Sequence, residues 1–391
     1  MTPPNPISEG PIIQGWCPGA LRPMLSGDGY VVRVRPRGGR LTPAQALGIA
    51  ELSQAHGNGL IDLSARANVQ LRGVTEASHP ALIDGLRALG LIDADVTAEQ
   101  RRNIVVQPFW TEADPTTRIT ADLAALLATD DAPALPGKFG FAVDCGAVPV
   151  LRSTAADIRI ESDGNSLILR ADGSHVAKPV TALTAATEAV ALAHWFIAMG
   201  GIQNGRGRMA ALIARGPALS DGFVRNVTLP HTPDPHPGPC DGGTLVAFEF
   251  GQMPAQTLAA LASHGALRVT PWRMLLIEGA QTAPALPGLI VTQDDPRLRT
   301  ISCTGAPGCL QAHQPTRALA RALAPHVPPG RILHVSGCAK GCAHPAAADF
   351  TLTATPQGFG LICGSSAAGE PVAHYPAAQL AAHPDLTFGT P

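Results

Sequence analysis

The chain has 391 residues, an apolar fraction of 45% and a formal net charge of −2. This length predicts two or three domains, or one fold built from repeated units. The near-neutral charge gives no electrostatic reason to expect a nucleic-acid or membrane partner. The apolar fraction is typical of a globular protein with a substantial core.

The N-terminal residues, "MTPPNPISEGPIIQGWCPG", contain no basic start followed by an apolar run, so we expect no secretory signal. The most apolar stretch, residues 189–202, is interrupted by His194 and is too short to span a bilayer. We therefore expect a cytoplasmic protein. In that compartment, clustered cysteines more often bind metal or carry out redox chemistry than form structural disulfides.

The chain contains an internal repeat. Residues 29–52 and 243–262 each combine an alternating β-rich run, a glycine turn and a helix rich in alanine and leucine. The two predicted helices begin with similar sequences, PAQAL and PAQTL. Proline is favoured in the first turn of a helix, which supports this placement. A further strand follows each helix, at residues 60–74 and 267–279. The sequence therefore predicts a strand–helix–strand unit that is used twice.

The repeat suggests a division of the whole chain. We place the repeated units at residues 15–80 and 243–285, and longer segments at residues 95–227 and 288–391. Residues 228–243 are rich in proline and are interpreted as a linker. His231, His236 and Cys240 lie there, where a metal site is conceivable, but an exposed linker is the simpler interpretation.

Four of the eight cysteines form two pairs that lie near each other in the sequence. Cys303 and Cys309 belong to "SCTGAPGC", whereas Cys338 and Cys342 belong to "SGCAKGC". A structural zinc site usually has fewer residues between paired ligands than separate Cys303 from Cys309. Glycines beside each pair would let the backbone approach a bulky iron–sulfur cluster. The pattern therefore favours such a cluster over zinc, with the sulfurs of the second pair on one side of a helical turn.

The cysteine spacing, together with "HVSGC" before the second pair, resembles the 4Fe–4S motif of siroheme-dependent sulfite and nitrite reductases. The resemblance covers nearly the whole chain. It implies an α+β fold with a duplicated nitrite/sulfite reductase-like architecture, in which two ferredoxin-like half-domains alternate with two larger α/β segments. It also implies that all four cysteines bind the cluster and that Cys342 bridges it to a tetrapyrrole iron.

The same resemblance implies three basic site residues. "SARANVQLRGV" puts Arg66 at an anion-binding arginine, "RRNIVV" puts Arg102 at a second, and "LPGKFGF" puts Lys138 at an active-site lysine. Sulfite reductases carry another lysine two positions later, where this chain has Gly140. A small oxyanion substrate would miss that charge.

The phase of an extended strand would group the polar residues near Arg66 on one face. These residues are Arg66, Asn68, Gln70 and Arg72. Such a face binds a polyanion or is simply solvated, and for single arginines the solvated surface is the commoner case.

Residues 15–36, "GWCPGALRPMLSGDGYVVRVRP", resemble the opening of precorrin-3B synthases of aerobic cobalamin biosynthesis. That membership implies an O2- and NADH-dependent monooxygenase that converts precorrin-3A to precorrin-3B, by hydroxylation of a ring carbon and lactone formation. Such a monooxygenation needs two external electrons, which implies NADH as the donor, directly or through a reductase. No complete nicotinamide-binding glycine motif follows a strand, so we expect no nicotinamide-binding domain in this chain. Precorrins and siroheme are related carboxylate-fringed rings, which arginines can bind in a bidentate manner.

Several alternatives stay open at this point. Siroheme, another haem or a mononuclear iron could each activate oxygen, but the spacing of His313, His334 and His344 fits no helical ligand pair. A siroheme-dependent sulfite or nitrite reductase, or a non-catalytic tetrapyrrole and iron–sulfur binding module, are the alternative functions. The remaining cysteines are most simply small buried or loop residues: Cys17, Cys145, Cys240 and Cys363.

Overall fold

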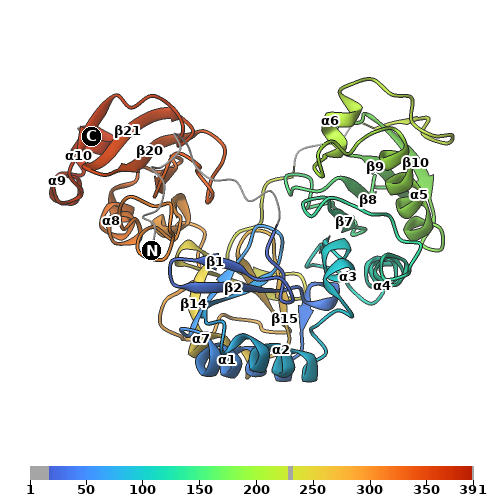
Figure 1. Ribbon diagram of the computed structural model, residues 1–391, viewed down its shortest axis with the longest axis horizontal. Helices are drawn as coiled ribbons and strands as arrows, with labels where there is room; N and C mark the ends of the chain where they lie inside the picture. The colour runs from blue at the N-terminus through green and yellow to red at the C-terminus, as the bar shows by residue number, and fades with distance from the viewer. Residues whose placement is uncertain (1–16, 228–231, 390–391) are drawn as a thin grey trace, which may run out of the picture. The chain divides into compact units, whose positions relative to one another are not determined.

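The computed structural model describes residues 17–227 and 232–389 (Figure 1). The chain forms two compact units. The larger, here called the half-domain unit, comprises Gly15–Met24 and Tyr30–Val291. The smaller, here called the cysteine unit, includes Leu25–Gly29 and Thr292–Pro391. Among the described residues, no helix has the length and apolar character needed to cross a membrane.

The first half-domain follows β1 (Met24–Ser26) in the chain. Its elements are β2 (Gly29–Val34), β3 (Arg40–Leu41), α1 (Pro43–His56), β4 (Leu60–Leu63), β5 (Val69–Val74) and α2 (His79–Ala88). Helix α1 begins with a capping box, in which the Thr42 side chain accepts from Gln45 N and the Gln45 side chain accepts from Thr42 N. This arrangement satisfies two backbone donors that have no partner within the helix.

The second half-domain repeats the order of the first. Its elements are β12 (Gly238–Cys240), β13 (Gly243–Phe248), β14 (Gln252–Pro254), α7 (Ala255–Ala262), β15 (Leu267–Val269), β16 (Met274–Glu278) and β17 (Leu289–Ile290). The predicted duplication is therefore present. The end of the predicted linker forms β12, an edge strand paired with β13, while His231 lies outside the described residues.

The strand predicted after each helix is instead a hairpin. Residues 60–74 form β4 and β5, and residues 267–279 form β15 and β16, so Arg66 lies in a turn and not within a strand. The two hairpins share one register, since Ile61 pairs with Leu71 as Leu267 pairs with Ile277. The expectation of one polar face from Arg66 to Arg72 was wrong because the turn breaks the strand phase.

The repeated Pro-Ala-Gln sequence does not occupy equivalent positions in the two helices, because it begins one residue earlier relative to α7 than relative to α1. Pro43 is the first residue of α1, whereas Pro254 precedes the first residue of α7. The fourth, seventh and eighth residues of each helix are buried, and these are Ala46, Ile49 and Ala50 in α1 and Leu258, Leu261 and Ala262 in α7. Burial therefore defines the true equivalence.

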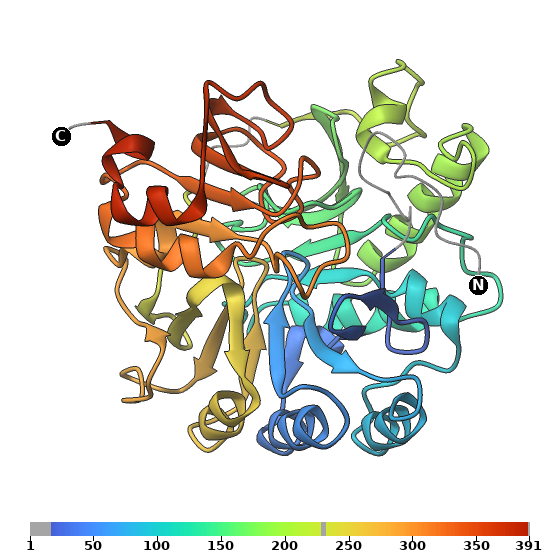
Figure 2. The same ribbon diagram turned by 60° about the vertical axis from the view of Figure 1, so that its left-hand side comes forward.

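Each half-domain contributes an edge strand to the sheet of the other. Strand β3 pairs with β15, and β14 pairs with β4. The helices α7, α1 and α2 lie side by side on one face (Figures 1 and 2), and α1 contacts both neighbours. One hydrophobic core runs through both half-domains, so neither has a core of its own.

The segment after the first half-domain is built on one mixed sheet. It contains α3 (Val96–Arg101), β6 (Ile104–Val106), α4 (Thr116–Leu127), β7 (Phe141–Asp144), β8 (Ile158–Ser162), β9 (Leu167–Ala171), β10 (Val176–Val180), α5 (Ala185–Ala198), α6 (Met209–Ile213) and β11 (Arg225–Asn226). Strands β6, β7 and β8 are parallel, whereas β9 and β10 are antiparallel to their neighbours. Helices α4 and α5 pack together beside a second core.

The cysteine unit repeats this strand order. It contains β18 (Thr300–Ser302), α8 (Arg317–Leu323), β19 (Leu333–Ser336), β20 (Ala348–Thr355), β21 (Gly358–Ser365), β22 (Ala373–Tyr375), α9 (Ala377–Ala382) and α10 (Asp385–Phe388). Strands β18, β19 and β20 are parallel, and β21 and β22 are antiparallel. The duplication therefore extends to the two larger segments, as expected for the α+β architecture.

A single carboxylate joins three parts of the half-domain unit. Glu278 accepts hydrogen bonds from Arg40 Nε (2.7 Å), Arg40 Nη2 (2.7 Å) and Arg268 Nε (2.6 Å). Arg268 Nη1 also donates to the carbonyls of Pro108 and Trp110, each at 2.7 Å. Burial would raise the pKa of Glu278, but the two arginines hold it below its usual range.

We expect Glu278→Gln to lower the free energy of unfolding by about 2 kcal/mol at neutral pH, because two arginines lose their charged acceptor. A carboxylate with a depressed folded-state pKa stabilises the fold above its unfolded pKa, and this contribution disappears as pH falls through the folded value. The deficit measured by urea unfolding should therefore shrink in acid. Asp84→Asn, which breaks the exposed pair with Arg87, is the control and should change little. A deficit that stays constant with pH would contradict this assignment.

Candidate iron–sulfur and anion-binding sites

The four predicted cluster ligands lie on two loops of the cysteine unit. Cys303 directly follows β18, and Cys338 follows β19 after one glycine. Because β18 and β19 are parallel, both cysteines emerge at the same edge of the sheet. The carboxyl edge of parallel strands is a common place for ligands and cofactors. Cys309 and Cys342 come from the continuation of these two loops.

A hydrogen bond to the Cys303 sulfur connects the two loops. Gly337 N donates to Cys303 Sγ at 3.1 Å, which joins the second loop to the first. A Cβ at Gly337 would lie 2.6 Å from Ala312 Cβ and 3.4 Å from Cys303 Sγ. Glycine is therefore needed for this close approach, and the peptide N–H stabilises negative charge on the sulfur.

The backbone of the loops is held by hydroxyl groups. Thr316 Oγ1 donates to Cys303 O at 2.9 Å, and Ser336 Oγ donates to Cys338 O at 2.8 Å. Cys338 and Cys342 lie in bends and turns, so the expected helical turn is absent from this described segment. A chain of turns permits two sulfurs to approach one centre without helical spacing.

The thiols are close enough to influence one another. Burial raises the pKa of Cys338 and of Cys342, and the neighbouring thiols add to the shift, since Cys303 and Cys309 act on both. Within residues 17–227 and 232–389, no three His, Cys, Asp or Glu side chains converge on a point suitable for a single metal ion. The thiols are nonetheless close enough to serve as ligands of one shared centre, as an iron–sulfur cluster requires.

Two guanidinium groups in the half-domain unit have only neutral hydrogen-bond acceptors among the described residues. Arg66 Nη2 donates to the carbonyl of Lys138 at 2.9 Å. Arg33 donates through Nε (3.0 Å) and Nη2 (2.6 Å) to Gln70 Oε1. Burial lowers the pKa of both arginines, and the positive charge of Arg33 adds to the lowering at Arg66. Partly buried cations without a carboxylate partner are suited to binding an external anion.

The sequence-predicted basic residues differ in availability. The Lys138 side chain is exposed next to the Arg66 contact. Arg102, in contrast, is 8% exposed and donates through Nε and Nη2 to Asp93, with both distances 2.8 Å. In this conformation its guanidinium group is engaged by a carboxylate. Arg33 was not predicted as a site residue, although the alternation in "YVVRVRP" places it on the polar side of β2.

Steric crowding explains why glycine occupies position 140. A Cβ there would lie 2.7 Å from Asn103 Nδ2, which itself donates to Phe139 O. A lysine at this position would therefore need the Asn103 side chain to move.

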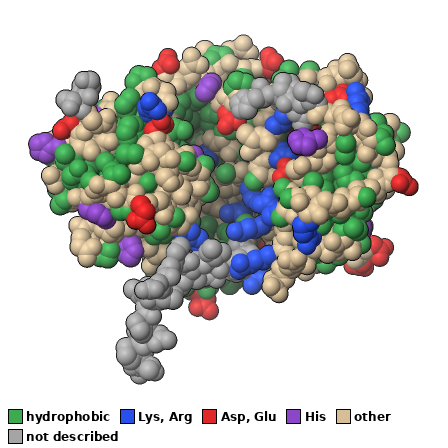
Figure 3. Space-filling model, turned by 90° about the horizontal axis from the view of Figure 1, so that it is seen from above, with side chains coloured by type: hydrophobic (Ala, Val, Ile, Leu, Met, Phe, Trp, Pro, Cys, Tyr) green, Lys and Arg blue, Asp and Glu red, His purple; other side chains and the backbone are tan. Residues whose placement is uncertain are grey.

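Figure 3 shows a group of Lys and Arg side chains gathered on one face of the molecule.

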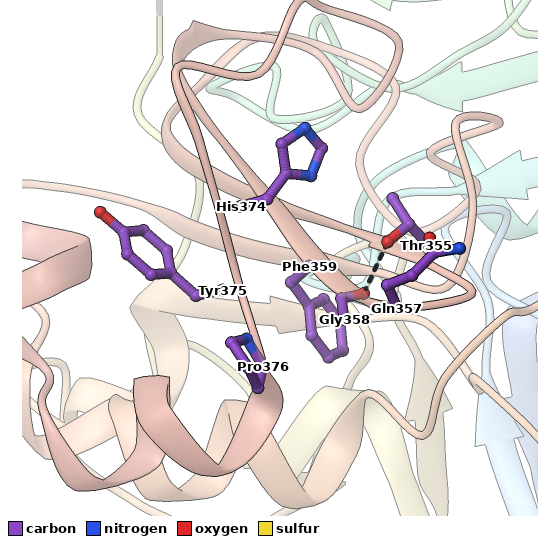
Figure 4. Close-up of a pocket in the computed structure, with 7 residues that line it drawn as sticks. All are labelled: Thr355, Gln357, Gly358, Phe359, His374, Tyr375 and Pro376. Carbon is purple, nitrogen blue, oxygen red and sulfur yellow. Dashed lines mark hydrogen bonds between the residues drawn. The ribbon is translucent and has the colours of Figure 1, made fainter.

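A cavity of about 310 Å³ lies elsewhere in the cysteine unit (Figure 4). Its walls come from the β20–β21 turn and from β22, and include Phe359, His374 and Tyr375. None of the four clustered cysteines lines it. We therefore do not associate this cavity with the cluster.

Comparisons with known proteins agree with the fold. Residues 22–89 match the family described as the nitrite/sulfite reductase ferredoxin-like half domain. A solved structure of the Mycobacterium tuberculosis NirA protein superposes with a TM-score of 0.62, covering 91% of this chain and 79% of that one at 16% identity. A chloroplastic ferredoxin–nitrite reductase of Zea mays is 36% identical over 80 residues, which cover 20% of this chain and 14% of the maize protein. The fold is thus that of nitrite and sulfite reductases.

A longer match narrows the assignment. A precorrin-3B synthase from Sinorhizobium sp. is 30% identical over 405 aligned residues, covering 92% of this chain and 85% of that protein. The chain belongs to the precorrin-3B synthase family.

We expect Cys303→Ser and Cys338→Ser each to abolish the cluster, because a hydroxyl group is a poor replacement for an iron-bound thiolate. Iron and acid-labile sulfide per chain, with the visible absorption spectrum, measure the loss. Cys363→Ser removes an exposed thiol of β21 in the same unit and is the matched control. A full cluster in either of the first two variants would refute this ligand set.

Proposed function

We propose that this protein is a precorrin-3B synthase, which hydroxylates a ring carbon of precorrin-3A and closes a lactone to form precorrin-3B. One oxygen atom of O2 enters the product and the other leaves as water. The two electrons required come from NADH, directly or through an electron-donating reductase. The observation that carries the proposal is the similarity to a precorrin-3B synthase along 92% of the chain.

The cysteine loops support the redox part of the proposal. Cys303, Cys309, Cys338 and Cys342 would hold a 4Fe–4S cluster, which supplies electrons for oxygen chemistry when bound. Cys342 is the most solvent-exposed of the four proposed ligands, and this accessibility supports a bridge to a tetrapyrrole iron. Siroheme, another haem or a mononuclear iron are the candidates for that additional metal.

The arginines support substrate binding. Precorrin-3A carries several carboxylates, and guanidinium groups bind carboxylates through paired, charge-assisted hydrogen bonds. Arg66 and Arg33 hold only neutral acceptors, so an incoming carboxylate replaces a weaker partner with a charged one. Exposed Lys138 adds a positive charge beside Arg66. Arg102 would take part only after exchanging its bond to Asp93.

A siroheme-dependent sulfite or nitrite reductase is the second candidate. It is favoured by the partial matches, which include 31% identity over 98 residues to the yeast sulfite reductase [NADPH] subunit beta, covering 25% of this chain and 7% of that protein. Crowding at Gly140 argues against it, because a lysine does not fit there unless Asn103 moves. A non-catalytic binding module is a third candidate, which a turnover assay separates from both.

Protein purified without oxygen should turn over precorrin-3A when O2 and a reductant are added, and mass spectrometry should show a product heavier by one oxygen atom. With labelled O2, the label should appear in that product. Sulfite and nitrite serve as the comparison substrates. A siroheme spectrum with turnover of either anion would overturn the proposal, and a cluster without any turnover would favour the binding module.

We expect Arg66→Ala to raise KM for precorrin-3A by about tenfold, because one charge-assisted carboxylate contact is lost. Arg66→Lys should recover only part of this binding, since lysine does not reproduce the bidentate geometry. The control is Arg87→Ala, which removes an exposed arginine of α2 that pairs only with Asp84 among the described residues. Steady-state kinetics that show an unchanged KM in Arg66→Ala would exclude a binding role for this residue.

A further inference from the structure

A distant segment of the chain holds the peptide bond that precedes Cys309. Ser26 Oγ donates to Gly308 O at 2.6 Å, and Gly27 N donates to the same oxygen at 3.2 Å. Residues Leu25–Gly29, here called the tip, belong to the cysteine unit although they lie far away in the sequence. The contact therefore lies within one compact unit.

The other side of the same peptide is also fixed. Cys309 N donates to Gly305 O at 2.8 Å. Both polar groups of the Gly308–Cys309 peptide are thus engaged, and the peptide plane cannot rotate without losing hydrogen bonds. A fixed peptide plane determines where the Cys309 side chain starts and which directions its thiol can reach.

Only glycine fits at position 27 without a steric clash. A Cβ at this position would lie 2.0 Å from Pro307 O and 3.1 Å from Gly308 C. Both atoms belong to backbone, so no flexible side chain can move aside. Any other residue would push the tip away from the loop and stretch the hydrogen bonds from Ser26 and Gly27.

Cys309 differs in this respect from two other proposed ligands. The carbonyl of Cys303 is held by Thr316, and the carbonyl of Cys338 by Ser336, both from the same part of the chain. The tip reaches its partner across 282 residues of sequence. The geometry of the first loop thus depends on a segment that contains none of the clustered cysteines.

We propose that the tip positions Cys309 for cluster binding, with Ser26 and Gly27 as the positioning residues. This inference rests on the proposed iron–sulfur site. Two donors on one carbonyl fix the direction of the Gly308 dipole, and dipoles beside a cluster influence its reduction potential. Loss of the tip contact should therefore loosen the loop, speed up cluster loss and shift the potential.

The experiment compares Ser26→Ala, which removes one donor, and Gly27→Ala, which displaces the tip, in the full chain. Ser26→Thr retains the hydroxyl group and should restore wild-type behaviour. Leu25→Ala is the matched control, because the Leu25 side chain is 64% exposed on the same tip. Far-UV circular dichroism establishes that each variant is folded.

The first readout needs no bound cluster. Hydrogen exchange in apo protein should be several-fold faster over residues 305–312 in Ser26→Ala and Gly27→Ala, and unchanged in Leu25→Ala. In loaded protein, the same two variants should lose iron to a chelator several-fold faster and show a shifted reduction potential. Exchange rates equal to wild type would overturn the inference. If hydrogen exchange is faster in the two variants but the wild-type protein does not turn over precorrin-3A, the result would count against the proposed function and not against the positioning role of the tip.

Discussion

The half-domain unit depends on the carboxylate of Glu278 and its two arginines. Arg40 comes from β3 of the first half-domain, and Arg268 from β15 of the second, at the point where these strands pair. The Arg268 guanidinium also lies 3.5 Å from the centre of the Trp110 ring, in the segment that follows the first half-domain. Partly buried charges are costly without partners, so this arrangement requires all three parts to be present together. The exchange of β3 and β14 imposes the same condition on the backbone, because each sheet would otherwise end one strand earlier.

Duplication of a fold does not duplicate its chemistry. The register of the two hairpins makes the turn around Arg66 equivalent to the turn around Trp272, with positive φ at both Ala67 and Arg273. Trp272 stacks on Phe109 with an interplanar angle of 22° and ring centres 6.3 Å apart. Position 66 of the first turn therefore carries a cation with a neutral acceptor, whereas the equivalent position 272 of the second turn carries a packed aromatic ring.

The sequence revealed composition, spacing and repetition, but not the contacts that depend on distant residues. The repeat and the paired cysteines were recognised because their signals are local. The hairpin at Arg66 was missed because Ala67 adopts a positive φ, which alternation of polar and apolar residues does not indicate. The engagement of Arg102 by Asp93 and the contact of Ser26 with Gly308 depend on the folded chain. The one-residue displacement of the PAQ letters shows that burial is a better guide to equivalence than identity in an alanine-rich chain.

The two larger segments show why a cluster is expected in one of them. Gln107 follows β6 as Cys303 follows β18, and both backbone N–H groups donate to the matching strand residue, Val143 or Val335. The Gln107 side chain forms hydrogen bonds with Thr116 and with the backbone of Phe109. At the equivalent position the cysteine unit has the thiol of Cys303. Cys145 follows β7, where burial raises the pKa of its thiol to about 12. The strand framework is common to both segments, and the side chains that follow its parallel strands differ: Gln107 and Cys145 stand in the first segment where the second presents the cysteine pairs of the proposed cluster site.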